Sequence, residues 1–260
     1  MGSAHGQGAL WGVESRVWSE TFEPITRPLF EQVHDELGTG GGTRLLDAGC
    51  GAGLALQIAA GRGAEVVGID ASAGMLAIAR ERNPDAELHE GDLEELPWDD
   101  DRFDAVTAFN SAQYAADPVV ALRELRRVAA AGAPVALASW AEAERCETRV
   151  VLAAIGGLLP PPPPGAGGPF ALSSPGNLEA LVEQAGLALQ RADEVAVDFL
   201  FASLDDAVRA HLSAGPAHRA IEHSGRQATA DTIRASLESS VQPDGTSVHR
   251  NAFRYLIATA

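Results

Sequence analysis

Short apolar runs that end in polar or turn residues recur through the first half of this 260-residue chain. They span residues 45–46, 65–69, 86–91, 103–110 and 134–140, and the first two end directly at Asp47 and Asp70. Runs of this length that are bounded by turn residues are typical of strands buried on both faces of a parallel sheet. The pattern therefore predicts five parallel strands.

Helical patterns lie between these runs. Residues 54–60 form one, Ser72 is a candidate N-cap for a second, and Asp117-Pro118 begins a third. Two more strands are expected at 194–201 and 251–259, and alternation along the last one predicts an antiparallel edge strand. The fold class expected is therefore α/β, with a doubly wound, mostly parallel, seven-stranded Rossmann-like sheet and a helical cap.

The remaining segments suggest how the chain is divided. Residues 1–40 are predicted to form an N-terminal helical segment, in which aromatic residues recur and which Pro24 and Pro28 interrupt. Its aromatic residues either form a lid over the ligand or cover the edge of the sheet. Residues 41–202 and 247–260 form the expected α/β core, and the polar, helical segment 203–246 is a cap inserted before the last strand. Residues 141–159 look helical, and the prolines at 160–164 predict a stiff spacer at the rim of the active site.

A glycine turn follows the first predicted strand. Gly49, Gly51 and Gly53 stand at alternate positions after Asp47, and the second strand ends in an acid, Asp70. Glycines let the backbone approach a ligand closely, and an acid at that strand end can accept hydrogen bonds from both hydroxyls of a ribose. The dinucleotide fingerprint G-x-G-x-x-G would need a further glycine at position 54, which is leucine, so a dehydrogenase is disfavoured.

A second acid-bearing loop adds to this picture. The stretch Gly91-Asp92-Leu93-Glu94-Glu95-Leu96-Pro97 closes the third predicted strand, and its Asp92 can accept the exocyclic amine of adenine. Asn110, Ser111 and Tyr114 follow the fourth strand, at the edge of the sheet where doubly wound proteins bind ligands. The sequence therefore predicts a nucleotide-binding site at this edge of the sheet.

These motifs resemble the class I S-adenosylmethionine-dependent methyltransferases, with a core like that of the ubiquinone and menaquinone methyltransferases. The resemblance covers about residues 40–140 and implies S-adenosylmethionine as the cofactor and S-adenosylhomocysteine as its product. It also implies a set of cofactor-binding residues. They are Trp18, Asp47, Gly49, Cys50, Gly51, Asp70, Ala71, Met75, Asp92, Leu93, Asn110 and Ser111.

The residues that act on the acceptor are harder to predict. The sulfonium is already activated, so the protein mainly positions and desolvates the nucleophile. Tyr114 follows the fourth strand, and His218 and His223 lie in the cap, where a neutral imidazole could take a proton from a hydroxyl acceptor. These three are the catalytic candidates, and no metal site is expected.

Composition limits the possible partners. The net charge of -17 disfavours nucleic acid and anionic membranes, and no apolar run approaches the roughly 18 residues of a membrane span. The start of the chain lacks the features of a secretory signal peptide, so a cytoplasmic monomer or homodimer is expected. The predicted function is methyl transfer to a small molecule of specialised, natural-product metabolism. The alternative is a cyclase that keeps the cofactor as a structural or electrostatic element.

Overall fold

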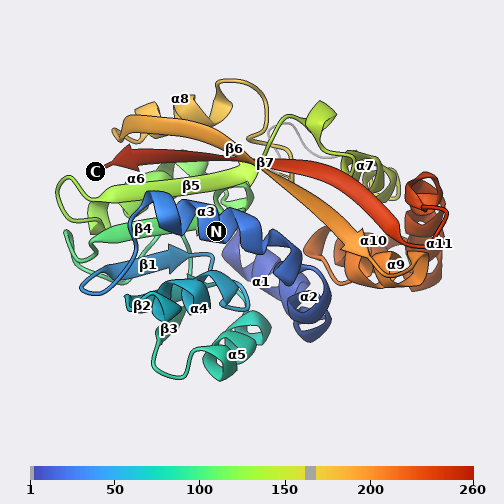
Figure 1. Ribbon diagram of the computed structural model, residues 1–260, viewed down its shortest axis with the longest axis horizontal. Helices are drawn as coiled ribbons and strands as arrows, with labels where there is room; N and C mark the ends of the chain where they lie inside the picture. Colours follow the sequence, from blue (N-terminus) through green and yellow to red (C-terminus); the bar gives the residue numbers. More distant parts are fainter. Residues whose placement is uncertain (1–2, 162–167) are drawn as a thin grey trace.

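The computed structural model describes residues 3–161 and 168–260. It confirms the predicted α/β architecture, with one seven-stranded sheet in the order β3-β2-β1-β4-β5-β7-β6 (Figure 1). Neighbouring strands from β3 to β5 pair in parallel, and β7 pairs antiparallel with both β5 and β6. The strands are β1 Arg44–Ala48, β2 Glu65–Asp70, β3 Glu87–Glu90, β4 Ala105–Phe109, β5 Pro134–Trp140, β6 Ala188–Phe201 and β7 Ser247–Thr259.

Consecutive leucines show why the central strands are mostly apolar on both faces. In β1, Leu45 packs with Leu56 and Leu76 on one face, and Leu46 packs with Leu122 on the other. Successive side chains of a strand point to opposite faces, so a sheet covered on both sides needs an apolar residue at every position. The helices of the first face are α3 Arg27–Glu36, α4 Leu54–Gly61 and α5 Ala73–Arg82. Those of the second face are α6 Pro118–Val128 and α8 Asn177–Gln184.

The predicted helix starts are confirmed at two positions. The Ser72 hydroxyl accepts the Met75 N–H at 3.3 Å at the start of α5. The Asp117 carboxylate accepts the N–H groups of Val119 and Val120 at the start of α6. Each side chain thereby satisfies backbone donors that have no partner within the helix.

Two predictions about the second half of the chain were wrong. The last strand is not an edge, because β7 lies between β5 and β6 and most of its side chains are buried. The edge is β6, which starts six residues earlier than expected and is exposed along its first half. The segment 141–159 holds a short 3-10 turn, η3 Ala143–Arg145, and the helix α7 Arg149–Gly156 rather than one continuous helix. The predicted spacer at 160–164 lies largely outside the described residues.

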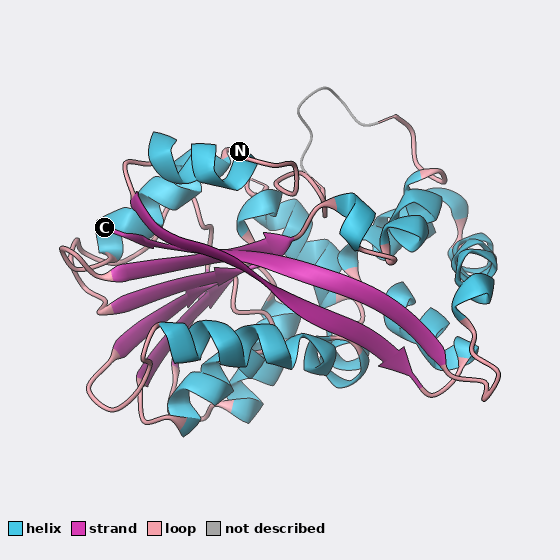
Figure 2. Ribbon diagram, turned by 45° about the horizontal axis from the view of Figure 1, so that its top comes forward, coloured by secondary structure: helices cyan, strands magenta, loops and turns pink. Residues whose placement is uncertain are grey.

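Helices gather beyond the carboxyl ends of the strands (Figures 1 and 2). The N-terminal group is α1 Ala4–Gly12, α2 Ser15–Thr21 and η1 Glu23–Thr26, followed by α3. The other group is α7, α9 Leu204–Leu212, α10 Gly215–Ser224, α11 Arg226–Leu237 and η4 Glu238–Ser240. The long strands β6 and β7 extend past the rest of the sheet to reach this second group (Figure 2).

Candidate functional site

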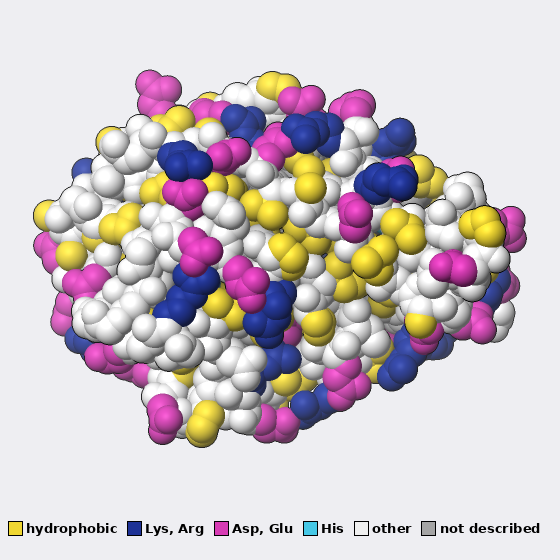
Figure 3. Space-filling view, viewed as in Figure 1, with side chains coloured by type: hydrophobic (Ala, Val, Ile, Leu, Met, Phe, Trp, Pro, Cys, Tyr) yellow, Lys and Arg dark blue, Asp and Glu magenta, His cyan; other side chains and the backbone are white. Residues whose placement is uncertain are grey.

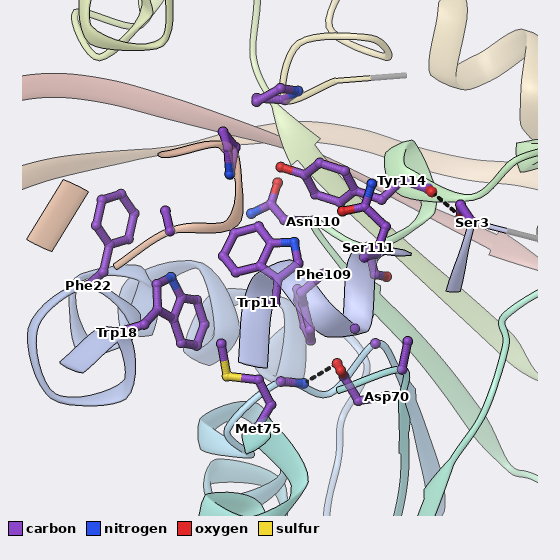
Figure 4. A pocket seen from close by; sticks show the side chains of 18 of the residues that line it. Ser3, Trp11, Trp18, Phe22, Asp70, Met75, Phe109, Asn110, Ser111 and Tyr114 are labelled. Atoms are coloured by element: carbon purple, nitrogen blue, oxygen red, sulfur yellow. Dashed lines mark hydrogen bonds between the residues drawn. The ribbon is translucent and has the colours of Figure 1, made fainter. Parts of the chain in front are cut away.

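One cavity lies where β1, β2 and β4 end and the two helical groups meet. Gly49, Asp70 and Asn110 line it from these three strand ends. Asp70 and Met75 lie at one side of it, and Asn110 and Tyr114 lie at the other, with Trp11 between them (Figure 4). Ligands of doubly wound sheets bind at this edge, so the cavity is the candidate functional site.

The glycine turn forms the floor of the cavity beside β1. Gly49 has a φ of 82°, and a Cβ there would lie 2.2 Å from the Ser111 Cβ, so only glycine fits. The Ser111 hydroxyl donates to the Ala48 carbonyl at 2.7 Å, which holds the end of β4 against the turn. Because Gly49 has no side chain and the Ser111 hydroxyl is bonded to Ala48, a ligand can approach the backbone of the turn closely.

The Asp70 carboxylate has hydrogen-bond acceptor positions left for a ligand. Its two oxygens accept the N–H groups of Gly51 and Ser72, each at 2.8 Å. A carboxylate has about four acceptor positions, so these two bonds leave room for the two hydroxyls of a ribose. Burial raises the pKa of Asp70, and the two N–H donors oppose that rise.

The cavity wall beside Asp70 is formed by Met75, Trp18 and Asp92 and suits the flat ring of a nucleobase. Met75 and Trp18 pack together on Ala52, and both line the cavity. Asp92 also lines it, and its Oδ1 accepts the Glu94 N–H at 3.0 Å, which orients the carboxylate. We call this set, together with Asp70 and the glycine turn, the cofactor half of the cavity.

Two of the predicted cofactor-binding residues, Asp47 and Cys50, do not line the cavity. Asp47 is 2% exposed inside the sheet, and its Oδ1 accepts the Thr107 hydroxyl at 2.8 Å. Burial raises the pKa of Asp47 to about 7. Cys50 is buried beside Gly68, where a Cβ would lie 2.8 Å from the Cys50 sulfur. The Asp47 and Cys50 side chains are therefore buried next to the glycine turn and do not face the cavity. The structure places all the other predicted cofactor residues at the cavity: Trp18, Gly49, Gly51, Asp70, Ala71, Met75, Asp92, Leu93, Asn110 and Ser111.

The rest of the cavity is an aromatic chamber. Its aromatic walls are Phe22, Phe30, Phe109, Trp140 and Phe253, which come from five separate parts of the chain. The ring centroids of Phe30 and Phe109 are 4.8 Å apart, and those of Trp140 and Phe253 are 4.6 Å apart. Both distances lie in the range of favourable aromatic pairs. The aromatic N-terminal segment, which contains Phe22 and Phe30, was expected near the ligand. Phe109, Trp140 and Phe253 were not predicted, since each of them reads as ordinary core within its own strand.

The chamber contains a histidine that was not among the catalytic candidates. His211 in α9 lines it, is 2% exposed, and has no hydrogen-bond partner for its Nε2 within the described chain. His218 is buried but does not line the cavity, and His223 is exposed to solvent. The expectation that His218 or His223 faces the ligand therefore disagrees with their placement. All three lie in α9 and α10, and their sequence spacing does not tell which one faces the cavity.

Tyr114 and Asn110 are two further polar residues at the chamber. Tyr114 lines the cavity as predicted, and burial raises the pKa of its phenol, so the hydroxyl remains a proton-bearing donor. Asn110 has a φ of 50°, in the left-handed region, and its buried Oδ1 has no partner among the described residues. A strained asparagine with a free acceptor at a cavity wall is typical of a ligand-binding position.

The described residues contain neither a metal-binding cluster nor a membrane-spanning helix. No group of three or more His, Cys, Asp or Glu side chains lies close enough to hold a metal ion. Within residues 3–161 and 168–260, no helix has the length and apolar character that a membrane span requires. On the face shown in Figure 3, basic and acidic side chains are interspersed rather than gathered by sign.

Comparisons with known proteins agree with this site. Residues 46–137 match the family model of a methyltransferase domain. Curated relatives include demethylmenaquinone methyltransferases of Renibacterium salmoninarum, 36% identical over 115 residues, and of Staphylococcus aureus, 39% identical over 111 residues. These alignments cover 44% and 40% of this chain and 48% and 46% of the relatives. The chain thus spans about half the length of the curated relatives it matches.

Solved structures share the fold over a larger part of the chain. A (4+2)-cyclase matches 89% of this chain and 79% of its own, with a TM-score of 0.58 and 20% identity. A geranyl diphosphate C-methyltransferase from Streptomyces coelicolor A3(2), solved with S-adenosyl-L-homocysteine, matches 95% and 83%, with a TM-score of 0.54 and 17% identity. Residues 46–137 of this chain are therefore similar to a methyltransferase domain, and the solved structures share the fold of the chain.

Proposed function

We propose that this protein transfers the methyl group of S-adenosylmethionine to a small organic acceptor held in the aromatic chamber, in a pathway of specialised metabolism. The observation that carries the proposal is the continuity of the cavity. Asp70 and Asp92 stand in its cofactor half, and the aromatic chamber opens directly from it. A cofactor and a second molecule can therefore meet there, away from bulk water.

The residues have distinct tasks in this proposal. Asp70 binds the ribose, Asp92 accepts the adenine amine, and Met75 and Trp18 pack on the base. Bound S-adenosylmethionine supplies a methyl group that its sulfonium already activates. The chain orients the acceptor for in-line attack and excludes water, which is how proximity accelerates such a displacement. Residues 1–40 act as the lid and 203–246 as the cap in this arrangement.

The first test is binding of the cofactor. Replacing Asp70 with alanine removes two charged hydrogen bonds to the ribose, each worth roughly 1.5–3 kcal/mol. Calorimetric titration with S-adenosylmethionine should show at least a tenfold loss of affinity, since about 1.4 kcal/mol corresponds to tenfold. Asp99→Ala, at an exposed acid outside the cavity, should bind like the native protein. Tight binding of NAD with none of S-adenosylmethionine would refute the proposal.

A cyclisation without methyl transfer is the second candidate. It is favoured by one observation: among the described residues, the aromatic chamber presents no carboxylate that could remove a proton from an acceptor. A structural neighbour with the same fold is a (4+2)-cyclase. Mass spectrometry of candidate acceptors separates the two reactions. A product one methyl group heavier supports transfer, whereas a product of unchanged mass formed with the cofactor retained supports cyclisation.

A further inference from the structure

The aromatic chamber differs in charge from the cofactor half. Among the described residues that line the whole cavity, the acidic ones are Asp70 and Asp92, both in the cofactor half, and no arginine contributes. Arg219 is close enough to lower the pKa of Tyr114, but it is exposed to solvent and does not line the cavity. A charged ligand group would lose its hydration in the chamber without gaining an ionic partner, which is costly.

His211 gives this uncharged chamber a polar end. Its ring lies edge-on to Phe22, with 5.4 Å between centroids, and 5.9 Å from Phe201. His249 lies behind it at 6.0 Å, and the Thr148 hydroxyl and His249 Nδ1 are hydrogen-bond partners at 3.4 Å. These neighbours hold the His211 ring, but none of the described residues satisfies its Nε2.

His211 and His218 both have a buried Nε2 without a partner among the described residues, but only His211 lines the cavity. Leaving a buried polar atom without a partner is costly, and leucine of similar size would fill the same space without that cost. Because His211 lines the chamber, a ligand that carries a hydroxyl or carbonyl group is placed to become the hydrogen-bond partner that the imidazole lacks. We propose that His211 is a specificity-determining residue that hydrogen-bonds a neutral hydroxyl or carbonyl group on an uncharged, largely aromatic acceptor. This inference rests on the proposed function, because it identifies the second molecule of that site.

The role is to bind and orient, not to take a proton. Burial lowers the pKa of His211 to about 3, and His249 adds to the effect. An imidazole that stays neutral above that pH is a poor proton acceptor, but it can serve as either a hydrogen-bond donor or an acceptor. Tyr114 likewise keeps its proton, so both polar groups suit a neutral partner.

Binding of small probes tests this inference without any turnover. The probes are 2-naphthol, naphthalene and 2-naphthoate, which share one aromatic body and differ in carrying a hydroxyl, nothing or a negative charge. Trp140 lines the chamber, so quenching of tryptophan fluorescence reports their binding. The native protein should bind 2-naphthol on the order of tenfold more tightly than naphthalene, and should bind 2-naphthoate most weakly.

Three variants assign the preference to His211. His211→Leu should abolish the preference for 2-naphthol over naphthalene, and His211→Gln, which keeps a donor and an acceptor, should retain it. The matched control is His218→Leu. His218 is also buried with an unpartnered Nε2 but lies outside the cavity, so this variant should behave like the native protein.

The outcomes separate this inference from the proposed function. Persistence of the 2-naphthol preference in His211→Leu, or tight binding of 2-naphthoate, overturns the inference. So does a lack of 2-naphthol binding at millimolar concentration. Titration with S-adenosylhomocysteine is run in parallel on each variant. If the cofactor product fails to bind while the probe pattern holds, the proposed methyl transfer fails and the neutral aromatic subsite stands.

Discussion

At the scale of single residues, burial raises the pKa of the acids beside the glycine turn, Asp47 and Asp70. Asp47 is held inside the sheet next to Asp70, with Glu23 also near enough to disfavour its ionisation. The Thr107 hydroxyl supplies its hydrogen bond and lowers its pKa, but burial has the larger effect. Protonation of Asp47 is therefore linked to the stability of the fold.

Asp47 should make stability fall with pH. Its pKa is about 7 in the folded protein, against an ordinary value near 4 in the unfolded chain. Between these values the folded state binds more protons, so the free energy of unfolding decreases as pH rises from about 4 to about 7. Asp47→Asn cannot ionise, and its urea unfolding should depend less on pH than that of the native protein. Asp85→Asn, at an exposed acid, should keep the native pH dependence. If the free energy of unfolding changed equally with pH in the native protein and in Asp47→Asn, the raised pKa of Asp47 would be contradicted.

At the scale of elements, the N-terminal helix α1 rests directly on the cofactor half. A Cβ on Gly8 would lie 2.0 Å from the Ala71 carbonyl oxygen, next to the strand end that carries Asp70. Further along α1, the Trp11 ring covers Gly215 of α10, where a Cβ would lie 2.7 Å away. One short helix thus contacts both the cofactor loop and the cap.

Gly8→Ala should loosen the cofactor site. The new methyl group cannot fit against a carbonyl oxygen, so α1 must shift, and overpacking of this kind costs about 1–3 kcal/mol. We expect affinity for S-adenosylhomocysteine to fall on the order of tenfold, measured by calorimetry. Gly6→Ala in the same helix has open space around its Cβ and shares the gain in helix propensity. The idea fails if the two variants bind the cofactor product equally well.

At the scale of the whole molecule, an ion pair between buried Glu23 and partly buried Arg82 joins the N-terminal segment to the core. Arg82 Nη1 of α5 lies 2.5 Å from Glu23 Oε2, and the same nitrogen donates to the Ala52 carbonyl at 2.9 Å. The other oxygen of Glu23 accepts the Leu54 N–H at 3.2 Å, at the start of α4. The N-terminal segment, the glycine turn and α5 therefore share one network.

Removing one partner of this pair should destabilise the protein. Glu23→Gln leaves Arg82 without its counter-charge, and breaking a buried pair costs about 3–5 kcal/mol. The exposed pair Arg16–Glu81 provides the comparison, with side chains 52% and 61% exposed. Glu81→Gln should cost at most about 1 kcal/mol. Chemical unfolding of both variants measures the difference, and similar losses would show that the Glu23 pair is not special.

The sequence by itself determined the α/β core and most of the cofactor half. Leu45-Leu46-Asp47 and the run that ends at Asp70 predicted strands β1 and β2, because buried parallel strands are continuously apolar. The alternate glycines and the acids Asp70 and Asp92 predicted the cofactor half, because their local order along strand, turn and helix already sets their positions. These inferences needed only contacts close in sequence.

Only the tertiary structure decided the rest. The last strand alternates like an edge, but β6 pairs along its outer side and makes it internal. The aromatic chamber collects Phe22, Phe109 and Phe253 from distant parts of the chain, so no local pattern could predict it. The choice of His211 over His218 depends on how α9 and α10 pack against the sheet. Such choices follow from long-range packing, which side-chain spacing within one helix does not encode.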